Sequence, residues 1–227
     1  MKSIDTAVQE GRTTLSEHES KQLLTTYDIP VTREILVKEQ KKLISAAQKI
    51  GFPLVMKGNS QTITHKTEKG LIRVDIRDDN EVKEAFEEIT RKMGDQGDGV
   101  LLLELIRGQR ELVVGLTRDP QFGPCVMFGL GGIFTEILKD ISFRVAPLEK
   151  RDALDMMQEI KGRKILEAVR GMEAADLDMM AHILINVGRI GLENDAIKEI
   201  DINPLILSGP RPVAVDALVV LERKEGA

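Results

Sequence analysis

The chain has 227 residues, enough to bury a substantial core in one large domain or in two small lobes. A net charge of −5, an aromatic content of only 3% and the lack of a long Lys/Arg block argue against nucleic-acid binding, because they leave neither a footprint for the phosphate backbone nor a stacking surface. Cys125 is the single cysteine, the polar N-terminus lacks an apolar signal core, and no apolar run reaches the roughly 18 residues of a membrane span, so we expect a cytoplasmic α/β protein that binds no membrane.

The chain begins with a stretch that shows no clear periodicity, so we expect residues 1–14 to be a polar lead-in. Ser16 and Glu19 have the spacing of a capping box and predict a short helix that ends before Pro30. A strand is expected at Glu34 to Val37. The apolar residues that follow share one face of a predicted helix: Leu43, Ala46, Ala47 and Ile50.

Two further strands and a helix complete the first half of the chain. The apolar strand Leu54 to Met56 runs into Lys57, and a polar loop with glycines leads from there to a strand at Leu71 to Ile76. Helical spacing then joins a third set of apolar residues: Val82, Ala85, Phe86, Ile89 and Met93. The segment Gly94 to Gly99 is rich in Gly and Asp, so we place a boundary there between a small lobe, 15–98, and a larger lobe, 99–227.

The second half is richer in strands. Strands are expected at Val100 to Ile106, Glu111 to Leu116 and Pro124 to Phe128, and the turn Gly129 to Gly132 leads into Ile133 to Val145. Helices are expected within Glu149 to Gly191. Two closing strands, Ile197 to Ile202 and Val213 to Leu221, flank a turn at Pro204 to Pro212. This order is a mixed α/β (α+β) pattern and disfavours a doubly wound Rossmann sheet.

A lysine-rich segment follows the strand that ends at Lys57. A lysine in that place has its ammonium at the end of a sheet, where anions bind in α/β folds. The loop beyond it adds hydroxyls, glycines, His65, Lys66 and Lys69, a mixture suited to a polyphosphate, although it lacks the Walker A pattern. A solvated turn remains the alternative for this loop.

Oxygen-bearing side chains gather near the end of the chain, in Glu199-Ile200-Asp201-Ile202-Asn203-Pro204. Strand alternation puts Asp201 and Asn203 on one face, and the turn after them can bring Asp216 back beside them. Such oxygens suit Mg²⁺ bound jointly with phosphate. A hairpin with polar turn residues explains the pattern equally well.

The strand that ends near Glu104 offers a third candidate site. Its backbone can meet an adenine edge, and carboxylates such as Glu104 and Glu111 can approach ribose hydroxyls. A core strand with charged ends is the alternative, and the Gly129 to Gly132 turn is a weak signal by itself.

Taken in chain order, these pieces resemble the ATP-grasp β subunit of ADP-forming acetyl-CoA (acyl-CoA) synthetases, and more distantly the β subunit of succinyl-CoA synthetase. The resemblance covers Leu15 to Leu221. Its most specific parts are Arg118 to Pro124, which runs into Phe128 to Gly132, and Glu199 to Leu205. It implies an ATP-grasp fold of two lobes with the nucleotide bound between them.

The resemblance also implies residue roles. Lys57 matches the lysine that holds the nucleotide phosphates, with Lys66 in the same group of residues. Glu104 would meet the adenine and Glu111 the ribose, and His65 matches a second phosphoryl carrier. The Mg²⁺ ligands would be Asn203 and Asp216, with Asp201 beside them. Relatives often continue the loop with Gly-Val, whereas Leu71 follows Gly70 here, so the detailed roles of Lys66 and Lys69 stay open.

The implied activity is that of an acid–thiol ligase: acyl-CoA, ADP and phosphate are converted to acid, ATP and CoA through acyl phosphate and phosphohistidine. The chain is too short to include the main phosphohistidine and the CoA site, which the resemblance assigns to an α subunit in an α2β2 enzyme. Two alternatives remain: another ATP-grasp ligase that joins a carboxylate to an amine, and a non-catalytic subunit that senses nucleotide.

Overall fold

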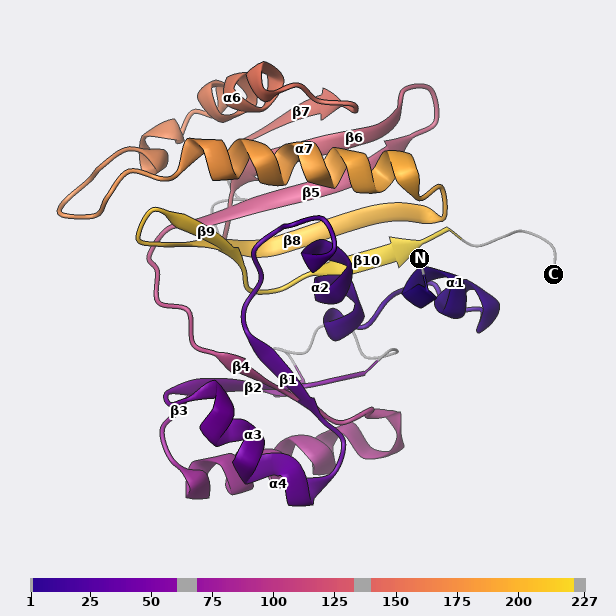
Figure 1. Cartoon of the computed structure of the whole chain (residues 1–227), viewed down its shortest axis with the longest axis vertical. Helices are drawn as coiled ribbons and strands as arrows, with labels where there is room; N and C mark the ends of the chain where they lie inside the picture. The colour runs from indigo at the N-terminus through magenta and orange to yellow at the C-terminus, as the bar shows by residue number, and fades with distance from the viewer. Residues whose placement is uncertain (1, 61–68, 133–139, 223–227) are drawn as a thin grey trace. The chain divides into compact units, whose positions relative to one another are not determined.

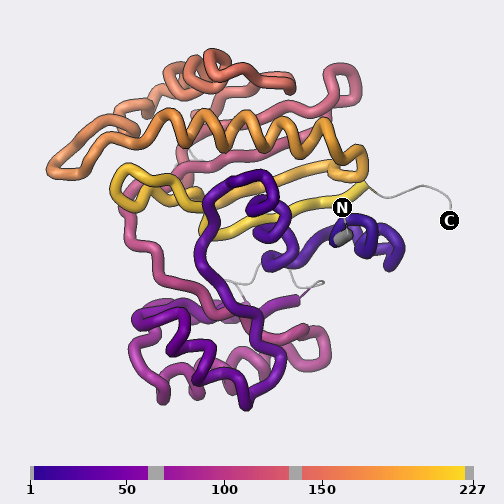
Figure 2. Tube along the Cα trace, viewed as in Figure 1, coloured from indigo at the N-terminus to yellow at the C-terminus, as the bar shows by residue number. Residues whose placement is uncertain are grey.

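The chain forms two compact units, each built on an antiparallel sheet, in a computed structural model that describes residues 2–60, 69–132 and 140–222 (Figure 1). The four-stranded unit consists of Ser16–His18 and Thr32–Ile106. The six-stranded unit consists of Met1–Leu15, Glu19–Val31 and Arg107–Ala227. The chain therefore leaves the six-stranded unit before the first strand and returns to it before the fifth, a path that Figure 2 traces.

The four-stranded unit has the strand order β1-β4-β2-β3. Its elements are β1 (Glu34–Val37), η1 (Gln40–Lys42), α3 (Leu43–Ile50), β2 (Leu54–Gly58), β3 (Ile72–Ile76), α4 (Asp79–Met93), η2 (Gly94–Gln96) and β4 (Val100–Glu104). The predicted face of α3 is confirmed, since its four apolar residues are all buried. Asp78 caps α4 by accepting hydrogen bonds from the backbone of Asn80 and Glu81.

The two faces of this sheet differ. Leu54, Met56 and Leu102 pack with the helices α3 and α4 in one apolar core. On the opposite face, Val55, Leu101 and Leu103 form a separate, smaller cluster. Because side chains alternate along a strand, Lys57 shares this second face with Val55.

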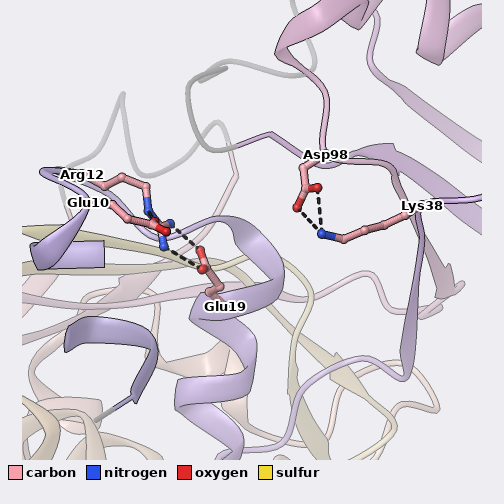
Figure 3. A network of polar contacts seen from close by, with 5 residues as sticks. All are labelled: Glu10, Arg12, Glu19, Lys38 and Asp98. Carbon is pink, nitrogen blue, oxygen red and sulfur yellow. Dashed lines mark hydrogen bonds and ion pairs between the residues drawn. The ribbon is translucent and has the colours of Figure 1, made fainter. Parts of the chain in front are cut away.

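The segment Gly94 to Gly99, where we expected a boundary between lobes, lies inside the four-stranded unit. The strand after it, β4, pairs with both β1 and β2, so it cannot be separated from that sheet. Lys38 donates to both carboxylate oxygens of Asp98 at 2.8 Å (Figure 3). Gly99 has φ +97°, and a Cβ there would lie 2.5 Å from the carbonyl oxygen of Val37, so only glycine fits. The Gly/Asp composition is thus typical of a tight connection, and the two units divide after Ile106 instead.

The six-stranded unit has the order β10-β8-β5-β6-β7, with β9 pairing to β8. Its elements are α1 (Lys2–Gln9), α2 (Glu17–Thr25, whose first two residues group with the other unit), β5 (Glu111–Asp119), β6 (Gly123–Leu130), β7 (Ile141–Val145), α6 (Lys150–Glu159), η3 (Arg163–Leu166), α7 (Leu177–Glu193), β8 (Ile197–Ser208), β9 (Arg211–Ala214) and β10 (Leu218–Leu221). The helices α6 and α7 cover one face of the sheet (Figure 1), where the main apolar core lies.

The expected polar lead-in contains a helix, α1. Ile4 and Ala7 are buried in the main core, and this packing stabilises the helix. Its three apolar residues have helical spacing, but a segment of 8 residues is too short for that pattern to stand out in the sequence. Arg12 then bonds both carboxylate oxygens of Glu19 at 2.8 and 2.9 Å and also contacts Glu10 (Figure 3).

The last strands also depart from the prediction. We expected a turn from Pro204 to Pro212, but β8 continues through Pro204 to Ser208 before it turns into β9. Proline usually ends a strand because it lacks an N–H donor. Here its carbonyl oxygen accepts from the backbone of Val215 at 3.0 Å, so the strand stays paired. Asp216 therefore lies in the connection between β9 and β10.

In the part of the chain that the structure describes, no helix has both the length and the apolar character to cross a membrane.

Candidate functional site

Lys57 lies on β2, an inner strand of the four-stranded sheet, and its side chain is buried. Its backbone pairs with Leu101 on β4 and with Ile72 on β3, so the strand cannot shift. Its ammonium nitrogen lies 2.8 Å from Oε1 of Glu17, and the two side chains are only 6% and 2% exposed. The sequence therefore identified a lysine in an unusual place, but not its buried partner.

The chain beyond Lys57 is held at its start. The backbone of Asn59 donates to Gly99 and accepts from Asp98, and the hydroxyl of Ser60 donates to the carbonyl of Gln96 at 2.7 Å. Two of the expected site residues, His65 and Lys66, lie outside the described residues. The structure thus fixes the position from which their loop departs.

Glu104 lies at the end of β4. Both of its carboxylate oxygens are bonded to Arg33, one to the backbone nitrogen at 2.8 Å and the other to Nε at 2.7 Å. The main chains of the two residues are also joined, since the backbone nitrogen of Glu104 donates to the carbonyl oxygen of Arg33 at 3.1 Å. The carboxylate of Glu104 therefore joins the end of β4 to the segment that carries Arg33.

Glu111, at the start of β5 in the six-stranded unit, is closely packed by the glycines of the expected turn. The backbone of Gly131 donates to the carbonyl of Glu111 at 2.8 Å, and a Cβ on Gly131 would lie 2.7 Å from the Glu111 carbonyl carbon. Gly132 has φ +64°, and a Cβ there would lie 2.9 Å from Oε2 of Glu111. The two glycines are needed because the backbone runs directly beside this carboxylate.

Acidic side chains meet on the face of the six-stranded sheet that α6 and α7 do not cover. Asp201 on β8 stands opposite Gly115 on β5, and Glu199 precedes it by two residues on the same face. Burial, and then the negative charges of Glu199 and Asp216, raise the pKa of Asp201 to about 6. The structure therefore brings Asp201 and Asp216 close enough to repel each other.

Asn203 follows on the same strand and is exposed. Because Val215 bonds to Pro204, the segment that carries Asp216 runs beside Asn203 and Pro204. Glu199 also belongs to this group. It was not among the site residues predicted from the sequence, although strand alternation places it on the same face as Asp201 and Asn203. Within the described ranges, no three His, Cys, Asp or Glu side chains are placed to hold a metal ion by themselves.

The motif from Arg118 to Pro124, the most specific part of the resemblance, has a structural role. Arg118 donates to the carbonyls of Gly191, Asn194 and Ile197, which end α7 and begin β8. Oδ1 of Asp119 accepts from the backbone of Gln121 and Phe122 and so forms the β5–β6 turn. These side chains hold the fold and do not belong to the candidate site.

Comparison with known proteins identifies the family of this chain. The sequence matches the family described as ATP-grasp domain over residues 6–221. It is 44% identical over 223 residues to the acetate–CoA ligase (ADP-forming) I subunit beta of Pyrococcus furiosus, with 96% of each chain covered.

Two solved structures of acetyl-coenzyme A synthetase 1 from Ca. Korarchaeum cryptofilum share the fold of this chain. The complex with coenzyme A, Ca-AMPCP and HgCl+ has a TM-score of 0.91 at 42% identity and covers 96% of this chain and 97% of that chain. The complex with coenzyme A and Mg-AMPPCP has a TM-score of 0.87 at 41% identity and covers 97% and 99%. With the matched sequences, these structures show that the chain belongs to the ATP-grasp family and, within it, to the β subunits of the ADP-forming acetate–CoA ligases, which are acid–thiol ligases.

Proposed function

We propose that this chain is the nucleotide-binding subunit of an enzyme that converts acyl-CoA, ADP and phosphate to carboxylic acid, ATP and CoA. The observation that carries the proposal is the group of oxygen-bearing side chains on β8 and after β9, in a chain of the ATP-grasp family. An α subunit would supply the CoA site and the main phosphohistidine, in an α2β2 enzyme.

Asn203 and Asp216 would hold a magnesium ion, with Asp201 beside them. Carboxylate and amide oxygens are the ligands this ion prefers, and it usually completes its shell with phosphate oxygens and water. Burial raises the pKa of Asp201 most, and the neighbouring charges of Glu199 and Asp216 raise it further; a cation would relieve the repulsion between these carboxylates, which supports the assignment. When bound, magnesium would supply positive charge against the phosphates of the nucleotide.

Lys57 would hold the phosphates, and Glu111 would accept hydrogen bonds from the ribose hydroxyls. Because the carboxylate of Glu104 already bonds Arg33, we assign the adenine contact to the backbone at and after Glu104. Phosphoryl transfer depends mostly on positioning and on neutralisation of charge, so these residues need no covalent role.

His65 would carry the phosphoryl group between the α subunit and the nucleotide. A neutral imidazole nitrogen would form a P–N bond as the P–N bond of the donor phosphohistidine breaks, and would then pass the group to ADP. In one of the matched structures, the phosphohistidine segment points towards the nucleotide binding site.

Titration of the chain with ATP, with and without Mg²⁺, tests the nucleotide site. The Asn203→Ala/Asp216→Ala double variant should lose at least about 100-fold in Mg²⁺-dependent affinity, a loss of two charge-assisted ligands. Asp178→Ala is the matched control, because that carboxylate belongs to the same unit and its side chain is 77% exposed. Retained affinity in the double variant would refute the assignment.

The role of His65 needs a separate experiment with the α partner. His65→Asn should abolish acyl-CoA-dependent ATP synthesis while ATP still binds, and labelled phosphate should appear on His65 of the wild-type chain. Full turnover by His65→Asn would exclude the carrier role and leave the nucleotide site unaffected.

A further inference from the structure

Lys57 has a buried partner, Glu17. Glu17 is the first residue of α2 and lies 40 positions before Lys57 in the chain. Its Oε1 lies 2.8 Å from the Lys57 ammonium, and its side chain is only 2% exposed. A buried ion pair of this kind stabilises the fold little compared with an apolar pair, so its presence calls for a functional reason.

The position of Glu17 is fixed from two sides. Its backbone belongs to the first turn of α2. The next residue, His18, is bonded through Nδ1 to Oε1 of Glu34 on β1 at 2.6 Å. Glu34 pairs with Leu103, and Lys57 with Leu101, so the His18–Glu34 hydrogen bond and the Glu17–Lys57 ion pair lie on the same face of the sheet. The start of α2 is thereby docked onto the face that carries Lys57.

We propose that Glu17 is a positioning residue, which sets both the direction and the effective charge of the Lys57 ammonium toward a nucleotide phosphate. This inference rests on the proposed function, in which Lys57 binds the phosphates. An ammonium has three N–H donors, so the bond to Glu17 is compatible with donation to a phosphate oxygen. The carboxylate also offsets part of the lysine charge, which limits how tightly ATP and ADP are held and lets the product leave.

The two contributions of Glu17 can be separated by two variants. Glu17→Gln keeps an oxygen that accepts from Lys57 and removes the negative charge. Glu17→Ala removes both. The readout is the affinity of the full-length chain for adenosine, AMP, ADP and ATP, because an effect on phosphate must grow along this series, whereas a fold defect acts on all four alike.

We expect Glu17→Gln to bind ATP more tightly than the wild type by about fivefold, with a smaller gain for ADP and none for adenosine, as loss of one nearby negative charge requires. Glu17→Ala should bind ATP at least about fivefold more weakly than Glu17→Gln, because the ammonium loses its hydrogen-bonded holder. Asp98→Asn is the matched control. It also removes the carboxylate partner of a lysine in the same unit, but the Asp98 side chain is 44% exposed, and all four affinities should be unchanged.

Equal affinities of Glu17→Gln and the wild type for ATP would overturn the inference, and so would a change that is as large for adenosine as for ATP. If Glu17→Ala does not fold, the affinities of Glu17→Gln for the four ligands still test the inference. Failure of the proposed function is distinguished by Lys57→Met: if this variant binds ATP as well as the wild type does, Lys57 does not hold phosphate. Absence of ATP binding by the wild-type chain would refute both.

Discussion

The two units differ in the charges that surround their candidate site residues. In the four-stranded unit, the charge of Lys57 is buried and already matched by Glu17 at 2.8 Å. In the six-stranded unit, burial and then the negative charges of Glu199 and Asp216 raise the pKa of Asp201 to about 6. One site is neutralised within the protein, and the other gathers charge of one sign.

The difference follows from what each site would bind. A lysine that holds a phosphate must stay charged and in place inside the protein, and a carboxylate partner ensures this. Carboxylates that lie close together gain from a bound cation, because the cation relieves the repulsion between them. Four changes test this contrast and the roles of other residues in the two units, beginning with the one that should have the largest effect.

Lys57→Met should destabilise the chain by about 3–5 kcal/mol, because it leaves the buried charge of Glu17 without its lysine. Lys38→Met is the matched control. Its ion pair with Asp98 has the same 2.8 Å distance, but the two side chains are 57% and 44% exposed, so the loss should be about 0–1 kcal/mol. Urea unfolding measures both, and similar losses in the two variants would contradict the contrast between a buried and an exposed pair.

Arg118→Met should destabilise the six-stranded unit by about 2–4 kcal/mol, since three carbonyls at the end of α7 and the start of β8 lose their charged donor. ATP affinity of the folded variant should not change, because Arg118 holds the fold. Arg151→Met, with a side chain 89% exposed, provides the control for loss of an arginine. A large loss of ATP affinity in the Arg118 variant, measured below its unfolding temperature, would place this motif in the binding site.

Gly132→Ala should destabilise the chain by about 2 kcal/mol, from the left-handed backbone and from contact with Glu111. It should also reduce the preference for ATP over 2′-deoxy-ATP, if Glu111 binds the ribose. Gly209→Ala separates these effects: its φ is +62°, but the nearest side-chain atom to its Cβ would lie at 3.6 Å. The same loss of preference in both variants would show that backbone strain, and not Glu111, is responsible.

Asp201→Asn should stabilise the metal-free chain above pH 6 by on the order of 1 kcal/mol. The folded pKa of Asp201, about 6, is above its ordinary value of 3.8. Stability due to the protonated acid is therefore complete below pH 3.8 and is lost as the pH rises to about 6. Asparagine stays neutral, so the variant and the wild type should have equal stability near pH 3.5 and diverge by pH 7 in thermal unfolding with EDTA. A constant difference at all pH values would show that Asp201 does not titrate in this range.

Much of the fold could be predicted from local patterns. The faces of α3 and α4 and the strand before Lys57 were predicted correctly, because each has a clear periodicity over its length. The helix α1, the continuation of β8 through Pro204 and the division after Ile106 were missed. Each of these depends on a partner distant in sequence: the main core for α1, Val215 for Pro204, and the pairing of β4 with β1 and β2.

The sequence by itself determined the family and the candidate residues, since the order of Lys57, the glycines near 130 and the Asp201-x-Asn203 pattern survives as a linear signal. Only the tertiary structure decided which charges meet. Glu17 reaches Lys57, and Arg33 binds the carboxylate of Glu104. Burial, with Glu199 and Asp216 beside it, raises the pKa of Asp201. The physical reason is that electrostatic interactions depend on distance and burial, and neither can be read from the spacing of residues along a chain.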